Sequence, residues 1–364
     1  MSENFSFTID ENTLQKMIKM KEEMGFGKKD WQSWFEALFN EEEEDTPVNQ
    51  TIERIFEKTT IQRYYDNWVR NFALNLENIW KGRSAKELSE ISSKDKTNSP
   101  AIVIGRGPSL EKNNHLELLA NSNYQGTIIC TDGILKKALD SGVTPEKFPN
   151  FYVVTIDTNE PILKFYSHDI VKKYGKKIKC LLSTTVPSTT YDAIKNSGME
   201  IFWLHTLFDY NKGKTSFNYI AGIITRAKNH EKGLSAIQTG GNVGTSSWVI
   251  SWSILKCSPV ALIGIDHGYP DDMSWEEINK IHKLPEGIDK TSPMFKKAYP
   301  TVYNPEFKTN CKQDPIFQYY SNALKEFIPR ASEWVKTVNA TEGGAIFGEG
   351  IECMTFTNFL NNFN

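Results

Sequence analysis

The chain has 364 residues, of which 39% are hydrophobic and 12% aromatic. This apolar content is enough for one large core, and it excludes an intrinsically disordered chain. Lys and Arg number 42 against 45 Asp and Glu, so a net charge of -3 argues against nucleic acid or an anionic membrane as the main partner. We therefore expect any phosphate binding to be confined to a local site.

Cysteine usage and hydropathy indicate a cytoplasmic protein. The five cysteines are scattered, with no C-x-x-C pair and no histidine at metal-ligand spacing, so we expect reduced thiols. No apolar run approaches the roughly 20 residues of a membrane span. Residues 1–8 also lack the basic-then-apolar pattern of a signal peptide. These features predict a cytoplasmic location and no transmembrane segment.

The chain is predicted to divide near residue 96. Residues 1–95 form the expected N-terminal helical region, because apolar residues such as Trp68 and Leu76 recur at three- and four-residue spacing. The polar segment 92–100 follows as a linker. Residues 96–364 form the expected nucleotide-binding catalytic domain.

Short apolar runs alternate with helix-length segments in this second part. Their near-continuous apolarity predicts strands that are buried on both faces, as in a parallel sheet covered by helices. The fold class is therefore predicted to be α/β, with a Rossmann-like, mostly parallel sheet flanked by helices. The expected strands are 101–104, 127–130, 151–156, 177–183, 200–204 and 260–265.

The first of these strands runs into a bend made of Gly105, Arg106, Gly107, Pro108 and Ser109. Ligands of open α/β sheets bind at the carboxyl ends of the strands, beside helix N-termini. The glycines would let a ligand approach closely, and Ser109 would cap the helix or donate to a phosphate oxygen. The bend lacks the third glycine of G-x-G-x-x-G and the Walker lysine. Gly105, Arg106, Gly107 and Ser109 are predicted to bind a nucleotide, with a plain turn as the alternative.

A second glycine turn precedes the strand at 260–265. Gly240, Gly241 and Asn242 open a predicted helix with Thr245 in its first turn. Free N–H groups at such a helix start suit an anion. We therefore place these four residues in the nucleotide site as well, with an ordinary loop as the alternative.

Two predicted strands end in an aspartate. Asp157 follows the strand at 151–156, and Asp266 follows the strand at 260–265. A carboxylate at this position can hold ribose hydroxyls or a divalent cation, or orient a base. The alternative is a turn or a helix cap. Asp157 is the predicted ligand if the reaction depends on Mg²⁺, the one cofactor that the sequence suggests.

Four motifs in order carry a family resemblance: VIGRGPSL, VVTID, the segment from GGNVGTSSW to IDHGY, and NATEGGAIFGEGIE. Together they resemble the MptE-like domain family, which includes Maf flagellin glycosyltransferases and archaeal 6-hydroxymethyl-dihydropterin diphosphokinases. The first and third motifs are also similar to bacterial lipooligosaccharide sialyltransferases. The resemblance covers residues 96 to about 360.

The resemblance implies catalytic candidates. The sialyltransferases have a nucleotide-contacting asparagine where this chain has Arg106, which would instead pair with a phosphate or carboxylate. That difference argues against a CMP-sugar donor. Their aspartate matches Asp266, and His267 and His282 are both candidates for the general base. Glu342, in the NATEGG bend, is a candidate base or acceptor-binding residue, with a plain turn as the alternative.

Three functions remain open. The first is a glycosyltransferase that moves a sugar, such as a nonulosonic acid, from a nucleotide-sugar to a hydroxyl of a glycan or protein. The aromatic segment 268–320 and the helical front would give it acceptor surface. The second is an ATP-dependent 6-hydroxymethyl-7,8-dihydropterin diphosphokinase. It should have two acids that converge on one Mg²⁺, whereas the strand ends at Asp157 and Asp266 each show only one, with Asp271 and Asp272 as further candidates. The third is a non-catalytic nucleotide-binding protein.

Overall fold

A computed structural model describes residues 11, 15–16, 18–19, 21, 47–89, 99–209, 213–226, 233–281 and 289–363. The chain forms two compact units, Met1–Glu57 and Lys58–Asn364. All that follows concerns the second unit. Its sheet includes a strand from the predicted helical region, β1 (Arg83–Ser84). The domain boundary at residues 95/96 stays a prediction.

The secondary structure alternates between strands and helices along most of this unit. The strands are β1 (Arg83–Ser84), β2 (Ala101–Ile104), β3 (Thr127–Thr131), β4 (Phe151–Thr155), β5 (Lys179–Ser183), β6 (Glu200–Thr206), β7 (Ser235–Ile237), β8 (Val260–Ile263), β9 (Tyr269–Pro270), β10 (Thr301–Asn304), β11 (Thr309–Lys312), β12 (Thr337–Asn339) and β13 (Ile351–Cys353). The helices are α3 (Pro47–Lys81), α5 (Ser109–Lys112), α6 (His115–Asn121), α7 (Leu135–Asp140), α8 (Asp169–Tyr174), α9 (Ser188–Asn196), α10 (Phe217–Arg226), α11 (Val243–Ser253), α12 (Trp275–Ile281), α13 (Pro293–Ala298), α14 (Pro315–Phe327) and α15 (Phe356–Asn362).

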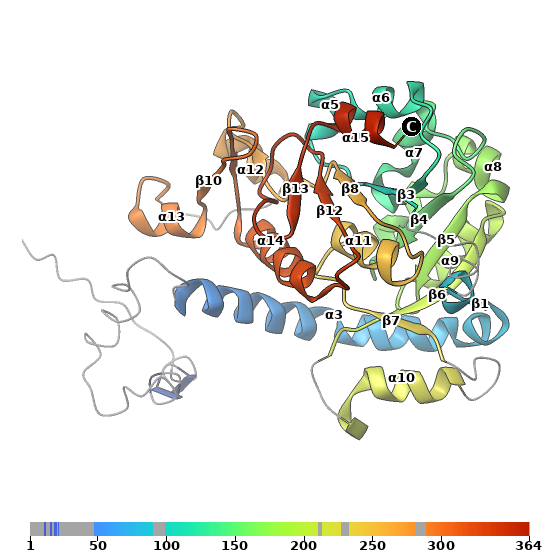
Figure 1. The fold of residues 1–364 in the computed structure, drawn as a ribbon. Helices are drawn as coiled ribbons and strands as arrows, with labels where there is room; N and C mark the ends of the chain where they lie inside the picture. Colours follow the sequence, from blue (N-terminus) through green and yellow to red (C-terminus); the bar gives the residue numbers. More distant parts are fainter. Residues whose placement is uncertain are drawn as a thin grey trace, which may run out of the picture. The chain divides into compact units, whose positions relative to one another are not determined.

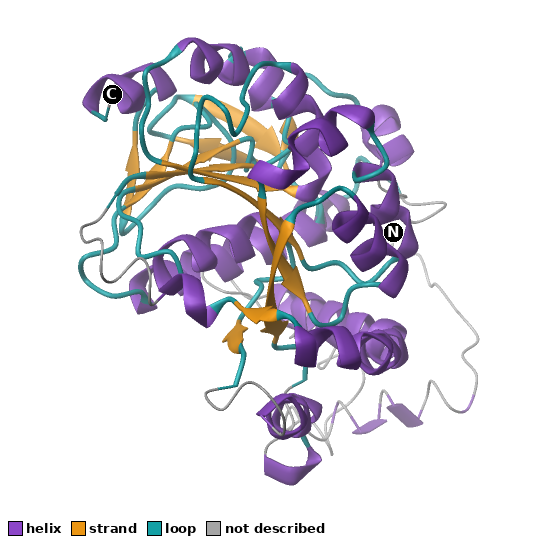
Figure 2. Cartoon of the chain, turned by 90° about the vertical axis from the view of Figure 1, so that its right-hand side faces the viewer, coloured by secondary structure: helices purple, strands orange, loops and turns teal. Residues whose placement is uncertain are grey.

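The main sheet has ten strands, and each of its pairings is parallel. The order is β1-β6-β5-β4-β3-β2-β8-β12-β13, with β7 also paired to β6. The sheet thus grows from β2 outward to β6, and the chain then returns to the other side of β2 with β8. The predicted fold class, an α/β fold with a mostly parallel sheet flanked by helices, is confirmed (Figures 1 and 2).

Helices cover both faces of this sheet. Alternate residues of each strand point to opposite sides, so the apolar side chains on both faces need to be covered. In β2, Ile102 and Ile104 join one core with α6, α7 and α15, while Ala101 and Val103 join another with α11 and α14. Figure 1 shows α6, α7 and α15 on one side of the strands and α11 and α14 on the other. All four β2 side chains are fully buried. This double burial explains the continuous apolar runs in the sequence.

The C-terminal part of α3 is fixed to the sheet by apolar and polar contacts. Phe72 and Ile79 are buried in the core. The Asn71 side-chain amide donates to the carbonyl of Thr185 at 2.9 Å, and that of Asn75 to the carbonyl of Val186 at 2.7 Å. Buried amides are stable only when bonded in this way. The helix therefore holds the loop that follows β5.

A small antiparallel sheet, in the order β10-β11-β9, grows from the carboxyl end of β8. Gly268 lies at its start, where an added Cβ would be 3.0 Å from Cys311 Sγ.

Among the described residues, no helix is long and apolar enough to cross a membrane. All five cysteines are free thiols.

Candidate functional site

The strand order reverses between β2 and β8. In open α/β sheets the crevice for a ligand lies outside the carboxyl ends of the strands at such a reversal. The glycine bend after β2 and Asp266 after β8 both lie there. The topology therefore brings the first and third sequence motifs to one place, as a ligand site would require.

Neither glycine of the bend has room for a side chain, because other parts of the chain occupy the space beside it. A Cβ on Gly105 would be 2.2 Å from the Gly264 carbonyl oxygen, and a Cβ on Gly107 would be 1.9 Å from Asp266 Oδ2. The Gly107 amide donates to the Gly264 carbonyl at 2.8 Å. Gly264 itself has a φ of +63°, a value that favours glycine. The bend after β2 and the turn after β8 are thus packed directly against one another.

Asp266 is bound to the bend. Its Oδ2 accepts a hydrogen bond from Ser109 Oγ at 2.9 Å, and the aspartate is only 9% exposed. Burial raises the pKa of Asp266 to about 6, against the opposing effect of the hydrogen bonds from Ser109. The structure therefore brings Asp266, Gly107 and Ser109 together, and it gives Asp266 an internal role in holding the bend.

The second glycine turn reaches the same place. Asn242 is the N-cap of α11, and its Oδ1 accepts from the Thr245 amide at 2.8 Å. A Cβ on Gly244 would be 2.7 Å from Cδ1 of Ile265. A Cβ on Gly105 would be 2.3 Å from the same atom. Both predicted glycine turns therefore converge on Ile265, the residue before Asp266.

Two tyrosines of α14 cover the start of α11. A Cβ on Gly241 would be 2.6 Å from Tyr319 Cε1 and 2.8 Å from Tyr320 Cε1. Gly240 has a φ of +55° and Gly241 a φ of +78°, so the turn itself favours glycine. The predicted anion-binding helix end is thus a capped turn beneath aromatic rings.

Arg106, at the tip of the first bend, points toward the neighbouring strands β3 and β4. Its charge lowers the pKa of both Asp132 and Asp157. A Cβ on Gly133 would be 3.2 Å from Arg106 Cδ, so the arginine stem lies over the turn after β3. The guanidinium forms no ion pair or hydrogen bond with any described residue. Arg106 is exposed and free to bind a ligand.

Asp132, which the sequence reasoning missed, lies beside Asp157. Asp132 follows β3 and is 6% exposed, and burial raises its pKa to about 7, with a further rise from the Asp157 charge. Its Oδ1 accepts from the Gly133 amide at 2.7 Å, and the nearby Thr155 hydroxyl also acts to lower the pKa of Asp132. No donor lies within hydrogen-bond distance of its Oδ2 among the described residues. The sequence contains the same indication for Asp132 as for Asp157, because each aspartate follows an apolar strand.

Asp157 is the exposed member of this carboxylate pair. Its Oδ1 accepts from the Thr158 amide at 2.8 Å and from the Asn159 side chain at 3.3 Å. Burial of the surrounding site raises its pKa, against these hydrogen bonds and the charge of Arg106. Burial raises the pKa of Tyr320 to about 12, and the Asp157 charge makes a smaller contribution in the same direction. Tyr320 therefore lies against the second glycine turn and within electrostatic reach of Asp157.

His267 is buried, with a φ of +46°. Its Nδ1 has no hydrogen-bond partner among the described residues, and its ring centroid is 5.9 Å from that of Tyr320. Burial lowers its pKa to about 3, with a smaller effect of Lys325 in the same direction. The imidazole is therefore neutral at pH 7. The other histidine candidate, His282, lies outside the described residues.

Glu342 has internal partners away from the carboxylate pair. Its Oε1 lies 3.3 Å from Nε2 of the fully buried His115 and accepts from the Phe356 amide, at the start of α15, at 3.1 Å. In the same bend, Asn339 Oδ1 accepts from the Thr341 amide at 2.9 Å. The NATEGG segment is therefore a self-bonded turn that ties β12 to α6 and α15.

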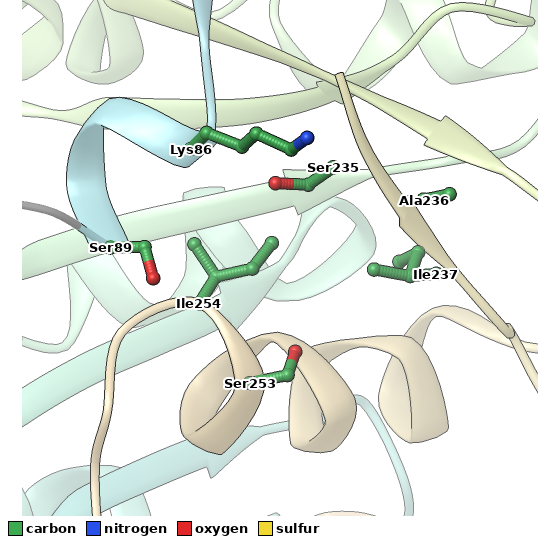
Figure 3. A pocket seen from close by; sticks show the side chains of 7 residues that line it. All are labelled: Lys86, Ser89, Ser235, Ala236, Ile237, Ser253 and Ile254. Atoms are coloured by element: carbon green, nitrogen blue, oxygen red, sulfur yellow. The ribbon is translucent and has the colours of Figure 1, made fainter. Parts of the chain in front are cut away.

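Two cavities lie away from the glycine bends. One, of about 440 Å³, is at the sheet edge, where Lys86 and β7 face Ser253 and Ile254 at the opposite end of α11 from the glycine turn (Figure 3). The other, of about 370 Å³, is formed by residues between the start of α12 and the start of β10, and its lining includes Trp275 and Tyr299. Only the second has aromatic rings of the kind that suit a ring-shaped substrate.

The parallel sheet, whose strand order reverses between β2 and β8, places the protein among the Rossmann-like α/β proteins. Residues 70–272 match the family described as "6-hydroxymethylpterin diphosphokinase MptE-like". Because this match covers more than half of the chain, the protein belongs to that family, and the predicted resemblance is confirmed.

The chain was also compared with solved structures and with proteins that have a curated description. The chain is similar to the solved structure of the MAf glycosyltransferase from Magnetospirillum magneticum AMB-1, with 14% identity and a TM-score of 0.47. That likeness covers 72% of this chain and 34% of the other, so the chain spans about a third of that protein's length. No protein with a curated description matches the chain.

Proposed function

We propose that this protein is a nucleotide-dependent transferase, and that its donor phosphates bind at the carboxyl ends of β2, β3 and β4. The observation that carries this proposal is Arg106, an exposed guanidinium without an internal partner beside the carboxylates of Asp132 and Asp157. Arginine binds phosphate through a planar set of donors, and it is weakly hydrated. An arginine at a Rossmann-like switch point is thus suited to a nucleotide.

The other predicted residues then divide by role. Gly105, Gly107 and Ser109 shape the bend that presents Arg106, and Asp266 positions that bend through Ser109. Gly240, Gly241, Asn242 and Thr245 would border the ligand from the start of α11. Catalytic roles for Asp266, His267 and Glu342 stay predictions.

Pyrophosphoryl transfer from a nucleoside triphosphate is the better supported reaction. The family description names a diphosphokinase, and this reaction needs two acids at one edge, which Asp132 and Asp157 supply. The acceptor hydroxyl oxygen would form a bond to the β-phosphorus, and the bond from that phosphorus to the α–β bridging oxygen would break. The nucleoside monophosphate leaves, and the hydroxyl proton passes to a base. We propose Asp157, the exposed carboxylate, as that base.

Glycosyl transfer from a nucleotide-sugar to a hydroxyl is the second candidate. It is favoured by the 370 Å³ cavity, where the Trp275 ring centroid lies 5.0 Å from that of Phe295 and 5.6 Å from that of Tyr299. Aromatic faces suit the apolar faces of sugars. The pair Asp132 and Asp157 would then hold the donor's ribose or its bound cation.

A nucleotide screen tests the proposal. The melting temperature of the full chain is measured with ATP, GTP, and CMP-, UDP- and GDP-sugars, each with Mg²⁺ and with EDTA. We expect at least one donor to stabilise the wild type and to lose this effect in Arg106→Ala. Phosphorus NMR of the stabilising donor with acceptor candidates then separates the reactions, because only pyrophosphoryl transfer releases a nucleoside monophosphate with a new diphosphate ester. Absence of stabilisation by every donor would overturn the proposal.

A further inference from the structure

We propose that the outward face of α10 binds the surface of an anionic lipid membrane. This apolar face consists of Tyr219, Ile220 and Ile223, and two basic residues, Lys214 and Arg226, flank it. The partner is a bilayer with acidic headgroups, into whose interface the three side chains insert without spanning it. This inference goes beyond the transferase reaction and does not depend on it.

The first argument is the number of large apolar side chains that α10 exposes. Tyr219 is 49% exposed, Ile220 38% and Ile223 51%. Because residues three and four positions apart lie on the same side of a helix, Ile223 is next to both of the others. A single exposed apolar residue is ordinary on a protein surface. Three neighbouring ones on a helix of ten residues are typical of an interaction site.

The second argument is that the opposite face of α10 is already packed within the protein. Phe217 and Ile224 pack against the main core, and Ala221 and Thr225 are buried. The Trp80 side chain of α3 donates to the Ile224 carbonyl at 3.0 Å. Figure 1 shows α10 at the lower edge of the second unit, beyond α3. The helix is therefore held in place with its apolar face turned away from the core.

Polar contacts also fix the start of α10. The Asn218 side-chain amide donates to the Asp209 carbonyl at 3.0 Å, and Asn218 Oδ1 lies 3.1 Å from Nε2 of the buried His205. On its other side, His205 Nδ1 lies 2.7 Å from the hydroxyl oxygen of Thr184. These contacts connect α10 to β6 and to the residue after β5. The apolar face is thus presented by a helix that the sheet holds firmly.

The third argument is the charge beside the apolar face. Lys214, shortly before α10, and Arg226, its last residue, are exposed, and neither forms an ion pair or hydrogen bond with a described residue. Residues 210–232 contain five Lys and Arg residues and a single acidic residue, Glu231, although the net charge of the whole chain is -3. Basic residues beside an apolar helix face attract acidic headgroups while the apolar side chains enter the bilayer interface. The local charge therefore favours an anionic membrane.

A lipid surface fits these observations better than a second copy of the chain. Two copies that met through this face would bring Lys214 and Arg226 of one copy against those of the other, and like-charge repulsion opposes this. Three exposed side chains also provide far less than the roughly 800 Å² per partner of a stable protein interface. Tyrosine suits the membrane interface, because its ring has an apolar body and a polar end.

Co-sedimentation of the full-length protein with lipid vesicles tests this surface. The vesicles consist either of phosphatidylcholine alone or of phosphatidylcholine and phosphatidylglycerol in equal parts. We expect the wild type to bind the acidic vesicles at least about tenfold more tightly. Ile223→Ser should weaken this binding about tenfold, the scale of losing one partly buried apolar side chain. Lys214→Gln should weaken it about fivefold, the scale of one basic residue near an acidic surface.

Leu118→Ser and Lys172→Gln are the matched controls. Leu118 is 37% exposed on α6, and Lys172 is an exposed lysine on α8 with a 3.7 Å ion pair to Asp169. Both variants should bind the acidic vesicles as tightly as the wild type. All four changes are at exposed positions, so the variants should keep the fold, and circular dichroism checks this.

Several results would overturn the proposal. One is a wild type that does not sediment with the acidic vesicles or that binds both kinds of vesicle equally. Another is Ile223→Ser binding as tightly as the wild type, or Leu118→Ser losing as much affinity as Ile223→Ser. A third is a dimer in analytical ultracentrifugation without lipid that Ile223→Ser dissociates, because a second copy would then cover the face. None of these results changes the outcome of the nucleotide screen, so the two proposals fail separately.

Discussion

The two halves of the sheet edge differ in how their polar residues are used. Beyond β8 and β12, the side chains of Asp266, Asn339 and Glu342 all accept hydrogen bonds from nearby loops and helices. The exception there is Nδ1 of the buried His267, which has no hydrogen-bond partner among the described residues. Beyond β2 and β3, Arg106 has no internal partner, and Asp132 has an unbonded oxygen. The two sets look alike in the sequence, because each follows an apolar strand.

This difference separates scaffold from site. A buried polar atom that is fully bonded within the chain stabilises a turn and has nothing left for a ligand. A buried polar group that lacks a hydrogen-bond partner lowers the stability of the fold unless a ligand supplies that partner. We propose that the carboxylates beyond β8 and β12 hold the turns and that Arg106 and Asp132, beyond β2 and β3, bind the ligand. The predictions below test this division.

The largest effect is expected from Gly107→Ala, where the bend after β2 packs against the turn after β8. The new Cβ would be 1.9 Å from Asp266 Oδ2 and 2.8 Å from the Gly264 carbonyl oxygen, so side chain and backbone must both shift. We expect a loss of about 3 kcal/mol in the free energy of unfolding, the upper range for overpacking. Urea denaturation measures it.

Gly222→Ala on α10 is its control. A Cβ on Gly222 meets no atom within 4 Å, and alanine is the better helix former, so this change should stabilise by up to about 1 kcal/mol. Equal stability of the two variants would show that the contact between the bend and the β8 turn is not tight.

The next effect is expected from Arg106→Ala, on the site side. It should weaken binding of the donor found in the nucleotide screen by about 10- to 100-fold, or roughly 1.4 to 2.7 kcal/mol. Stability should fall only slightly at neutral pH, because the variant loses the favourable effect of the Arg106 charge on Asp132 and Asp157 but no hydrogen bond or ion pair. A loss of stability with unchanged donor affinity would move Arg106 to the scaffold.

Asp132→Asn should show a pH-dependent gain in stability. The pKa of Asp132 is raised to about 7 in the folded state, so between about pH 4 and pH 7 the unfolded chain is ionised while the folded chain keeps the proton. Wild-type stability therefore falls as the pH rises through this window. The variant escapes this penalty, and by pH 8 its melting temperature should be roughly 4 °C higher.

Thermal unfolding at pH 4 and pH 8, in EDTA, measures this difference. It should be close to zero at pH 4 and largest at pH 8. A variant that is less stable than the wild type at pH 8 would show that the Asp132 carboxylate is already satisfied within the chain.

The smallest effect is expected from Ser109→Ala. It removes the 2.9 Å hydrogen bond to the buried Asp266 and should cost about 1 kcal/mol of stability. Ser109 is 5% exposed, so we expect donor affinity to stay within about twofold of the wild type. An affinity loss as large as that of Arg106→Ala would place Ser109 in direct contact with the donor.

Local features of the sequence determined the elements and their turns. The strand AIVI reads as buried because all four residues are apolar, and the structure buries all four. Gly240, Gly241 and Asn242 predicted a helix start, and Asn242 is the N-cap of α11. These features depend on neighbouring residues alone, which is why a single sequence reveals them.

Only the tertiary structure decided which polar residues meet. Asp132 and Asp157 are 25 positions apart in the numbering of the chain, and nothing local links them or Arg106. They meet because β3 is placed between β2 and β4, a strand order set by packing over the whole sheet. The same packing gave Asp266 and Glu342 internal partners. Whether a strand-end carboxylate is bonded or free depends on distant segments, and this is the reason its role could not be predicted from its own motif.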